Sequence, residues 1–173
     1  ARYLNYEEKI NCRLTVIPMY NYRRGMTWEQ TGLPWIPPSP NIPNPQAAMC
    51  FAATGSIGET GNFDLGLGTP LAFQIISAGW LDANSATNYL NNLKLPGILF
   101  RATTFKKAPA VQLWVSDPKV FQPVLTEIAI ISYLKRRHPD RFRFSSDGKL
   151  SRIQMFDKAM GTDKIRRAIE ANW

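Results

Sequence analysis

The chain has 173 residues, of which 45% are hydrophobic and 12% aromatic, so it can bury a core and is not a disordered protein. Its formal net charge of +8 favours an anionic partner or surface. With only two cysteines and one histidine (His138), the chain argues against a zinc site, a disulfide framework and a Ser-His-Asp triad, and we expect no metal and no cofactor. It has no apolar run long enough to suggest a membrane span.

The first predicted element is a half-buried strand over Cys12–Pro18, because Cys12, Leu14 and Val16 alternate with polar or exposed positions. An irregular stretch follows. Five prolines between 37 and 45 fix φ and remove backbone donors, and five glycines between 55 and 68 permit unusual backbone shapes. The apolar residues within it need burial, so we predict an ordered functional loop over 35–69 rather than a disordered one.

The second half of the chain predicts a βαβ crossover over about 71–105. Its parts are a strand at Leu71–Ser77, a helix at Ala83–Asn92 capped by Asp82, and a strand at Ile98–Phe105 parallel to the first. Further predicted elements are a strand at Ala110–Ser116, a long and largely buried helix at Val124–Arg137, a short edge strand at Phe142–Phe144, a helix at Ile153–Met160 ended by Gly161, and a helix at Asp163–Trp173 capped by Thr162. The predicted fold class is α+β, with a mixed β-sheet flanked by helices and long Pro/Gly-rich loops.

The glycine-rich loop carries two carboxylates, Glu59 and Asp64, which are candidates for the acid, base or nucleophile of a glycosidase. Solvated surface charge is the alternative for both. Arg101 lies in mid-strand among apolar residues and needs a partner. That partner is either a ligand carboxylate or an internal one, from Glu59, Asp64 or Asp82.

Aromatic and basic residues are a second group of candidates. Trp80 and the other tryptophans of the central region can stack on sugar rings or fill the core. The basic run Lys135–Arg143 follows the long helix, where it can complement the helix dipole as solvated charge or bind an anion.

Several segments are distinctive when taken together: Leu14-Thr-Val-Ile-Pro-Met19, Met26-Thr-Trp-Glu-Gln-Thr-Gly-Leu-Pro-Trp-Ile-Pro-Pro-Ser-Pro-Asn-Ile-Pro43, Gly66-Leu-Gly-Thr69, Trp80-Leu-Asp82, Phe100-Arg101, Val111-Gln-Leu-Trp-Val-Ser-Asp117, Phe121-Gln-Pro123 and Phe156-Asp-Lys-Ala-Met-Gly-Thr-Asp163. In these segments the chain resembles the exo-β-N-acetylmuramidases, the NamZ-like glycoside hydrolases.

The resemblance implies a secreted or cell-envelope enzyme that removes N-acetylmuramic acid from non-reducing ends of peptidoglycan fragments. It implies that 1–173 is a single carboxy-terminal domain, that a Rossmann-like amino-terminal domain is missing as its partner, and that this chain alone is inactive. We expect the catalytic residues to be Glu59 and Asp64, and the substrate-binding residues to be Asn41, Thr69, Trp80, Arg101 and Gln112.

Two other functions stay open. One is a non-catalytic module that binds anionic glycan through its basic surface, or nucleic acid, which is the less favoured ligand. The other is a structural domain without a ligand.

Overall fold

The structure is a computed structural model that describes residues 1–171. The chain divides into two compact units, Ala1–Gly32 and Leu33–Trp173. The first unit contains helix α1 (Arg2–Glu7) and a short 3-10 helix, η1 (Glu29–Thr31), joined by an extended, turn-containing segment.

The predicted strand at Cys12–Pro18 is wrong for the described residues: the segment is extended but pairs with no strand there. Its apolar side chains are open to solvent, with Val16 45% and Ile17 87% exposed. Alternating apolar residues indicate that an extended segment can present one apolar face. A β-strand also needs a neighbouring strand with which to form hydrogen bonds. The Asn5 side chain holds the start of this segment, exchanging two hydrogen bonds with the backbone of Cys12.

The second unit opens with the proline-rich loop and helix α2 (Pro45–Glu59). The prediction of a loop over 35–69 is therefore wrong for residues 45–59. Asn44 is the N-cap, its Oδ1 accepting from the Ala47 amide at 2.8 Å, and Pro45 occupies the first turn, where its missing N–H costs nothing. Gly58 serves packing here, because a Cβ at that position would lie 2.9 Å from Leu65 Cδ1.

The sheet has three strands, β1 (Ile75–Ser77), β2 (Ile98–Phe105) and β3 (Ala108–Val115), in the order β1-β3-β2. The α+β class is confirmed. Helix α3 (Ala83–Asn92) joins β1 to β2 as predicted, and these strands are parallel to one another, but β3 lies between them. Every pairing is therefore antiparallel, which corrects the expected mixed pairing. The predicted strand at 71–77 is shortened because turns occupy 70–74.

Three further helices complete the unit: α4 (Pro123–Arg137), α5 (Leu150–Met160) and α6 (Lys164–Glu170). Gly161 ends α5 at φ +73°, as predicted. The predicted cap of α6 is off by one residue, since Asp163 is its N-cap, although Thr162 Oγ1 accepts from the Lys164 amide. The predicted end of α6 at Trp173 lies outside the described residues. No described helix is long and apolar enough to cross a membrane.

Two predictions about this region are corrected. The α4 helix is buried along only part of its circumference, since Val124 and Leu125 stay 54% and 44% exposed. The segment Phe142–Phe144 is irregular chain rather than an edge strand, although both phenylalanines are buried as anchors.

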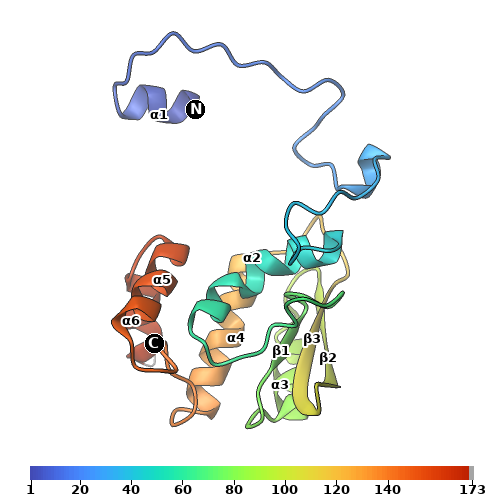
Figure 1. Ribbon diagram of the computed structural model, residues 1–173, viewed down its shortest axis with the longest axis vertical. Helices are drawn as coiled ribbons and strands as arrows, with labels where there is room; N and C mark the ends of the chain where they lie inside the picture. Colours follow the sequence, from blue (N-terminus) through green and yellow to red (C-terminus); the bar gives the residue numbers. More distant parts are fainter. Residues whose placement is uncertain (172–173) are drawn as a thin grey trace. The chain divides into compact units, whose positions relative to one another are not determined.

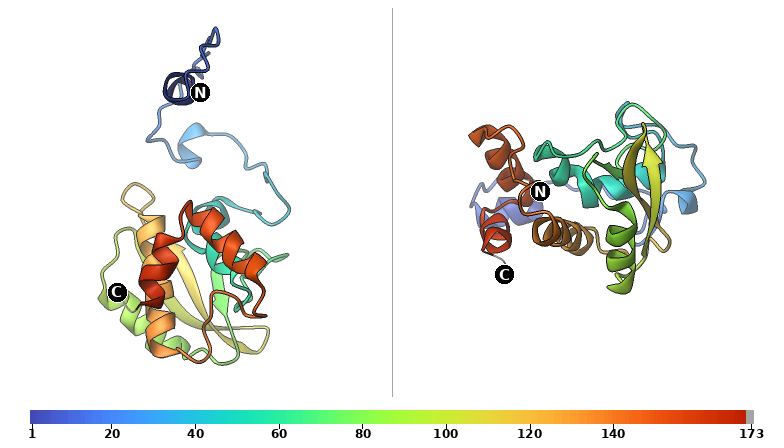
Figure 2. Two further views of the ribbon diagram at one scale, coloured as in Figure 1. Left: turned by 90° about the vertical axis from the view of Figure 1, so that its left-hand side faces the viewer. Right: turned by 90° about the horizontal axis from the view of Figure 1, so that it is seen from below.

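The elements stack in layers: the sheet, then α2 with α4, then α5 with α6, as Figures 1 and 2 show. Helix α3 packs on β2 and β3. The core between sheet and helices is apolar, and it includes Ile76, Leu81, Ala86, Leu90, Val111, Ile130, Tyr133 and Leu134. The opposite face of β2 and β3 carries exposed side chains.

One carboxylate is buried in the α2–α4 contact. Glu127, only 4% exposed, accepts hydrogen bonds from the Ser56 hydroxyl and from the Ile57 amide, the latter at 3.2 Å. No cation pairs with it among the described residues. Burial raises the pKa of Glu127, and the hydrogen bonds from Ser56 and Ile57 only partly oppose that rise.

We predict that Glu127→Gln raises the free energy of unfolding at pH 7 by on the order of 1 kcal/mol. A raised folded-state pKa gives stability that is complete below the ordinary carboxyl value of 4.5 and is lost as pH rises through the folded value. Glutamine keeps the acceptor oxygen and does not titrate. Urea unfolding between pH 4 and pH 8 measures this, with the exposed Glu29→Gln as matched control. A constant difference between Glu127→Gln and wild type across that range contradicts the prediction.

Candidate functional site

The open face of the sheet carries the first candidate site, a hollow of about 410 Å³ lined by Leu99, Phe100, Arg101, Gln112 and Trp114. The register places Arg101 opposite Gln112 and Leu99 opposite Trp114. Since side chains alternate between the two faces of a strand, the buried Leu113 holds its neighbours Gln112 and Trp114 on the open side. We call this hollow the sheet-face site.

Arg101 is the charged group of the sheet-face site, and no described carboxylate pairs with it. The internal partners considered from sequence are engaged elsewhere or unpaired. Asp64 bonds Lys106 Nζ at 2.8 Å, and Asp82 caps α3 through Ser85. The internal-salt-bridge alternative for Arg101 is therefore wrong.

The chemistry of the sheet-face site suits an acidic sugar. A guanidinium offers a planar fork of donors for a carboxylate, and the neighbouring Gln112 amide can both donate and accept. The Trp114 indole is 53% exposed and offers an apolar face on which a sugar ring can stack. The sequence has several tryptophans that could bind a sugar. Trp114 is distinguished by lying between Leu113 and Val115, which are buried, so that its own side chain faces away from the core.

The two carboxylates proposed as catalytic lie near each other in sequence but on different elements. Glu59 is the last residue of α2, and its carbonyl accepts from Arg152 Nη1 at 3.3 Å. Asp64 forms an antiparallel bridge with Ser77 beside β1. Partial burial acts to raise the pKa of Asp64, but the hydrogen bonds from Lys106 and the Gly66 amide outweigh it and hold the pKa below its ordinary value.

The remaining predicted binding residues are dispersed. Asn41 is exposed in the proline-rich loop, where its backbone N–H donates to Ser39 Oγ. The Thr69 hydroxyl closes a local turn, donating to the Gly66 carbonyl at 2.7 Å and accepting from the Leu71 amide. Asn41, Thr69 and Glu59 line neither the sheet-face site nor the two further hollows that lie near Trp80 and at the start of α3.

Trp80 lines a second hollow of about 350 Å³, away from Arg101 and Gln112. Its neighbours there are Gly61, Asn62, Asp140, Arg141, Arg143 and Ser146, and we call this hollow the basic pocket. The structure thus places the predicted substrate-binding residues in separate sites, with Arg101 and Gln112 together and Trp80 apart.

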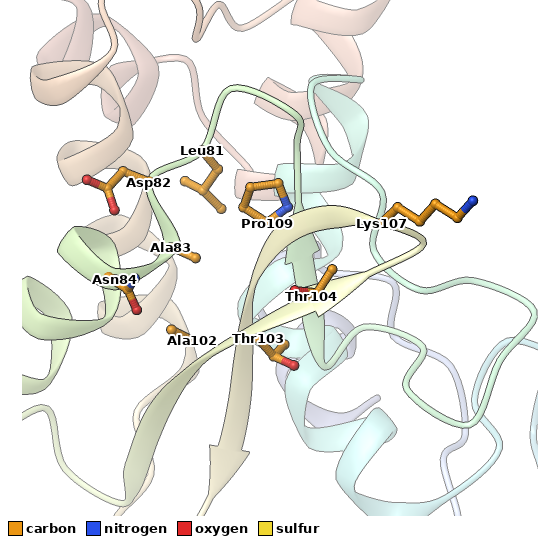
Figure 3. Close-up of a pocket in the computed structure, with 9 residues that line it drawn as sticks. All are labelled: Leu81, Asp82, Ala83, Asn84, Ala102, Thr103, Thr104, Lys107 and Pro109. Atoms are coloured by element: carbon orange, nitrogen blue, oxygen red, sulfur yellow. The ribbon is translucent and has the colours of Figure 1, made fainter.

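A third hollow, of about 480 Å³, lies between the start of α3 and the β2–β3 hairpin (Figure 3). Figure 3 shows the Asp82 carboxylate and the Lys107 ammonium pointing to opposite sides. Both Asp82 oxygens accept from Ser85, which lowers the pKa of Asp82. This hollow contains none of the predicted site residues.

Neither cysteine is bridged, Cys50 being buried and Cys12 exposed, and burial raises the pKa of Cys50 to about 12. Among the residues described, no cluster of three His, Cys, Asp or Glu side chains could hold a metal ion.

Comparison with known proteins identifies the family. The family model for exo-beta-N-acetylmuramidase NamZ, C-terminal, matches residues 49–173, and the one for NamZ, N-terminal, matches residues 1–46. The peptidoglycan beta-N-acetylmuramidase NamZ of Bacillus subtilis is 35% identical over 179 residues, which cover 98% of this chain and 42% of that protein. A crystal structure of a DUF1343 family protein from Bacteroides fragilis superposes with a TM-score of 0.86 at 31% identity, covering 98% of this chain and 47% of that one.

The fold is α+β, and its sheet-face site offers a guanidinium, an amide and an exposed indole side by side. The chain belongs to the NamZ exo-β-N-acetylmuramidase family. It spans a little under half the length of the relatives it matches.

We predict that Lys106→Gln raises the pKa of Asp64, because it removes the ammonium whose hydrogen bond and charge hold that pKa down. A ¹³C-detected NMR titration of the side-chain carboxyl carbons measures the change. Lys107→Gln, at the neighbouring hairpin position, is the control, and we expect it to leave the pKa of Asp64 unchanged. An Asp64 titration unchanged by Lys106→Gln shows that the Gly66 amide, not Lys106, sets it.

Proposed function

We propose that this chain is the substrate-cleft part of a glycoside hydrolase that releases N-acetylmuramic acid from non-reducing ends of peptidoglycan fragments. The family supports the reaction class, and the Bacillus subtilis relative is named for a peptidoglycan muramidase. The observation that carries the proposal is Arg101, which has no ion pair with any described carboxylate and lies beside Gln112 and Trp114 on an open sheet face. Muramic acid differs from glucosamine by a lactyl group that carries a carboxylate, and this carboxylate can supply the partner that Arg101 lacks among the described residues.

In this proposal the roles of the sheet-face residues divide by chemistry. Arg101 binds the lactyl carboxylate, Gln112 hydrogen-bonds a sugar oxygen, and Trp114 supports the ring. The catalytic candidates are Glu59 and Asp64. The lowered pKa of Asp64 keeps it ionised, which suits a base, a nucleophile or an electrostatic stabiliser rather than a proton donor.

We also propose that the whole protein carries an amino-terminal domain and that catalysis needs it. The relatives are more than twice as long as this chain, and the NamZ amino-terminal family model matches residues 1–46. Residues 14–19 lie within that match, so we assign them to the amino-terminal domain, and their exposed apolar side chains are then a surface for the rest of that domain to cover. Since peptidoglycan lies outside the cytoplasmic membrane, we place the enzyme in the cell envelope or outside the cell.

The second candidate function is a non-catalytic module that binds anionic glycan or nucleic acid. One observation favours it: Arg141 and Arg143 lie in the basic pocket without an ion pair to any described carboxylate. Nucleic-acid binding through such a surface weakens steeply with salt, whereas recognition of one carboxylate does not.

We predict that Arg101→Ala in the full-length enzyme raises KM for muramides about tenfold to a hundredfold and leaves KM for uncharged glucosaminides within about twofold. The lost interaction is a charge-assisted pair that only the muramide makes. Arg101→Lys keeps the charge without the fork and gives an intermediate value. The control is Arg167→Gln, which removes an exposed charge on α6. Equal losses on both substrates contradict a role for Arg101 in carboxylate recognition.

We predict that residues 1–173 alone melt cooperatively but do not hydrolyse a chromogenic muramide. Glycoside hydrolysis needs two carboxyl groups about 5–10 Å apart across the scissile bond, and we assign one participant to the amino-terminal domain. Activity is measured with and without that domain added in trans. Multiple turnovers by residues 1–173 alone contradict this assignment, and their loss in both Glu59→Gln and Asp64→Asn identifies those residues as a self-sufficient pair.

A further inference from the structure

The basic pocket is lined by residues whose positions are fixed by packing and by hydrogen bonds. Residues 141–144 alternate, with Arg141 and Arg143 exposed and Phe142 and Phe144 0% and 4% exposed. The two phenylalanines face the core, and the arginines beside them stay at the surface, where both line the pocket. Phe142 lies edge-on to Phe144, and Phe144 packs in turn on Phe156 of α5.

Hydrogen bonds attach this segment to the turn after α2. Asn62 Nδ2 donates to the Arg143 carbonyl at 2.6 Å, and the Ser146 amide donates to the Thr60 carbonyl at 2.9 Å. The turn itself requires glycine at 61, where φ is +72° and a Cβ would lie 2.5 Å from Ser146 Oγ. The backbone on both sides of the pocket is therefore fixed.

Trp80 forms the aromatic wall of the pocket. Its ring packs against Phe63 at a centroid distance of 5.4 Å and against His138 at 5.0 Å. It is only partly buried, so the rest of the indole is available to a ligand. A planar ring held in this way loses little conformational entropy when a sugar stacks on it.

The charges of the pocket favour an anion. Arg141 and Arg143 have no ion pair with any described carboxylate, and the one acidic residue lining the pocket is Asp140. The nearby Asp147 is already paired with Lys149 and Arg152. An anion can therefore pair with two guanidinium groups, while Asp140 can accept hydrogen bonds from sugar hydroxyls.

We infer that the basic pocket is a second glycan subsite, which stacks a sugar ring on Trp80 and binds the carboxylate of an acidic sugar through Arg141 and Arg143. The identity of the glycan as a peptidoglycan fragment rests on the proposed function, whereas the chemistry of the pocket does not. The basic pocket and the sheet-face site are separate hollows. In a peptidoglycan fragment, the basic pocket would therefore bind a different sugar from the one at Arg101.

The test is an NMR titration of the ¹⁵N-labelled chain, in which the indole resonances of Trp80 and Trp114 report the two sites separately. Trp80→Phe and Trp114→Phe assign these resonances. The probes are N-acetylmuramic acid and N-acetylglucosamine, which share the ring and differ in the carboxylate. We expect N-acetylmuramic acid to shift the Trp80 resonance with an affinity about tenfold above that of N-acetylglucosamine.

Variants separate this inference from the proposed function. Arg143→Gln weakens binding at Trp80 about tenfold and leaves the Trp114 response unchanged, Arg101→Ala does the reverse, and Arg167→Gln changes neither. A Trp80 resonance that does not move, or that moves equally with both sugars, overturns the inference even if the Trp114 response is intact. Binding of a short single-stranded oligonucleotide with a steep salt dependence, and no response to the acidic sugar, overturns it in favour of nucleic acid.

Discussion

The position of every group in the sheet-face site depends on the pairing of β3 along both of its edges. β2 pairs along the full length of β3 and sets Arg101 opposite Gln112. On the other edge β1 is only three residues long, and beyond it the Gln46 side chain takes over, accepting from the Val115 amide and donating to its carbonyl at 2.8 Å. An amide side chain here does what a further strand residue would do. It connects the first turn of α2 to the sheet and satisfies the backbone beside Trp114.

The elements that periodicity predicts well are those whose burial is decided locally. α3, β2 and β3 begin and end within two residues of prediction, because each presents one apolar face and ends at a turn or cap. α2 was missed although Asn44 and Pro45 are good start signals, since Gly55 and Gly58 suggested a loop. Glycine is tolerated there because Leu65 packs where the Gly58 side chain would be. The strand at 12–18 failed for the opposite reason, because its pattern was correct but pairing needs an edge that sequence does not reveal.

The β2–β3 hairpin explains why the site could be predicted only in part. Both residues of its two-residue loop, Lys106 and Lys107, have positive φ, at 47° and 68°. Such turns are usually marked by Asn-Gly, so a Lys-Lys pair gives no signal in sequence. Lys106 bonds Asp64 and lies 5.0 Å from the Phe105 ring centroid, contacts that help to hold the turn. The sequence alone shows Arg101 and Gln112 only as two polar residues on separate strands. The hairpin turn sets the register of β2 and β3 that places these residues opposite each other.

The same local geometry argues against a purely structural role for Arg101. A buried arginine with a carboxylate partner would be a structural residue, and removing either side would leave an unpaired charge. Arg101 is instead exposed, and it forms no ion pair with a described carboxylate, Asp64 being engaged at the hairpin and Asp82 at the start of α3. Its neighbours are an amide and an indole. Solvation alone accounts for an isolated surface arginine, but not for an exposed tryptophan and an exposed leucine beside it, which are costly to leave in water. The combination fits a surface that a ligand covers, with the charge satisfied by the ligand's own carboxylate.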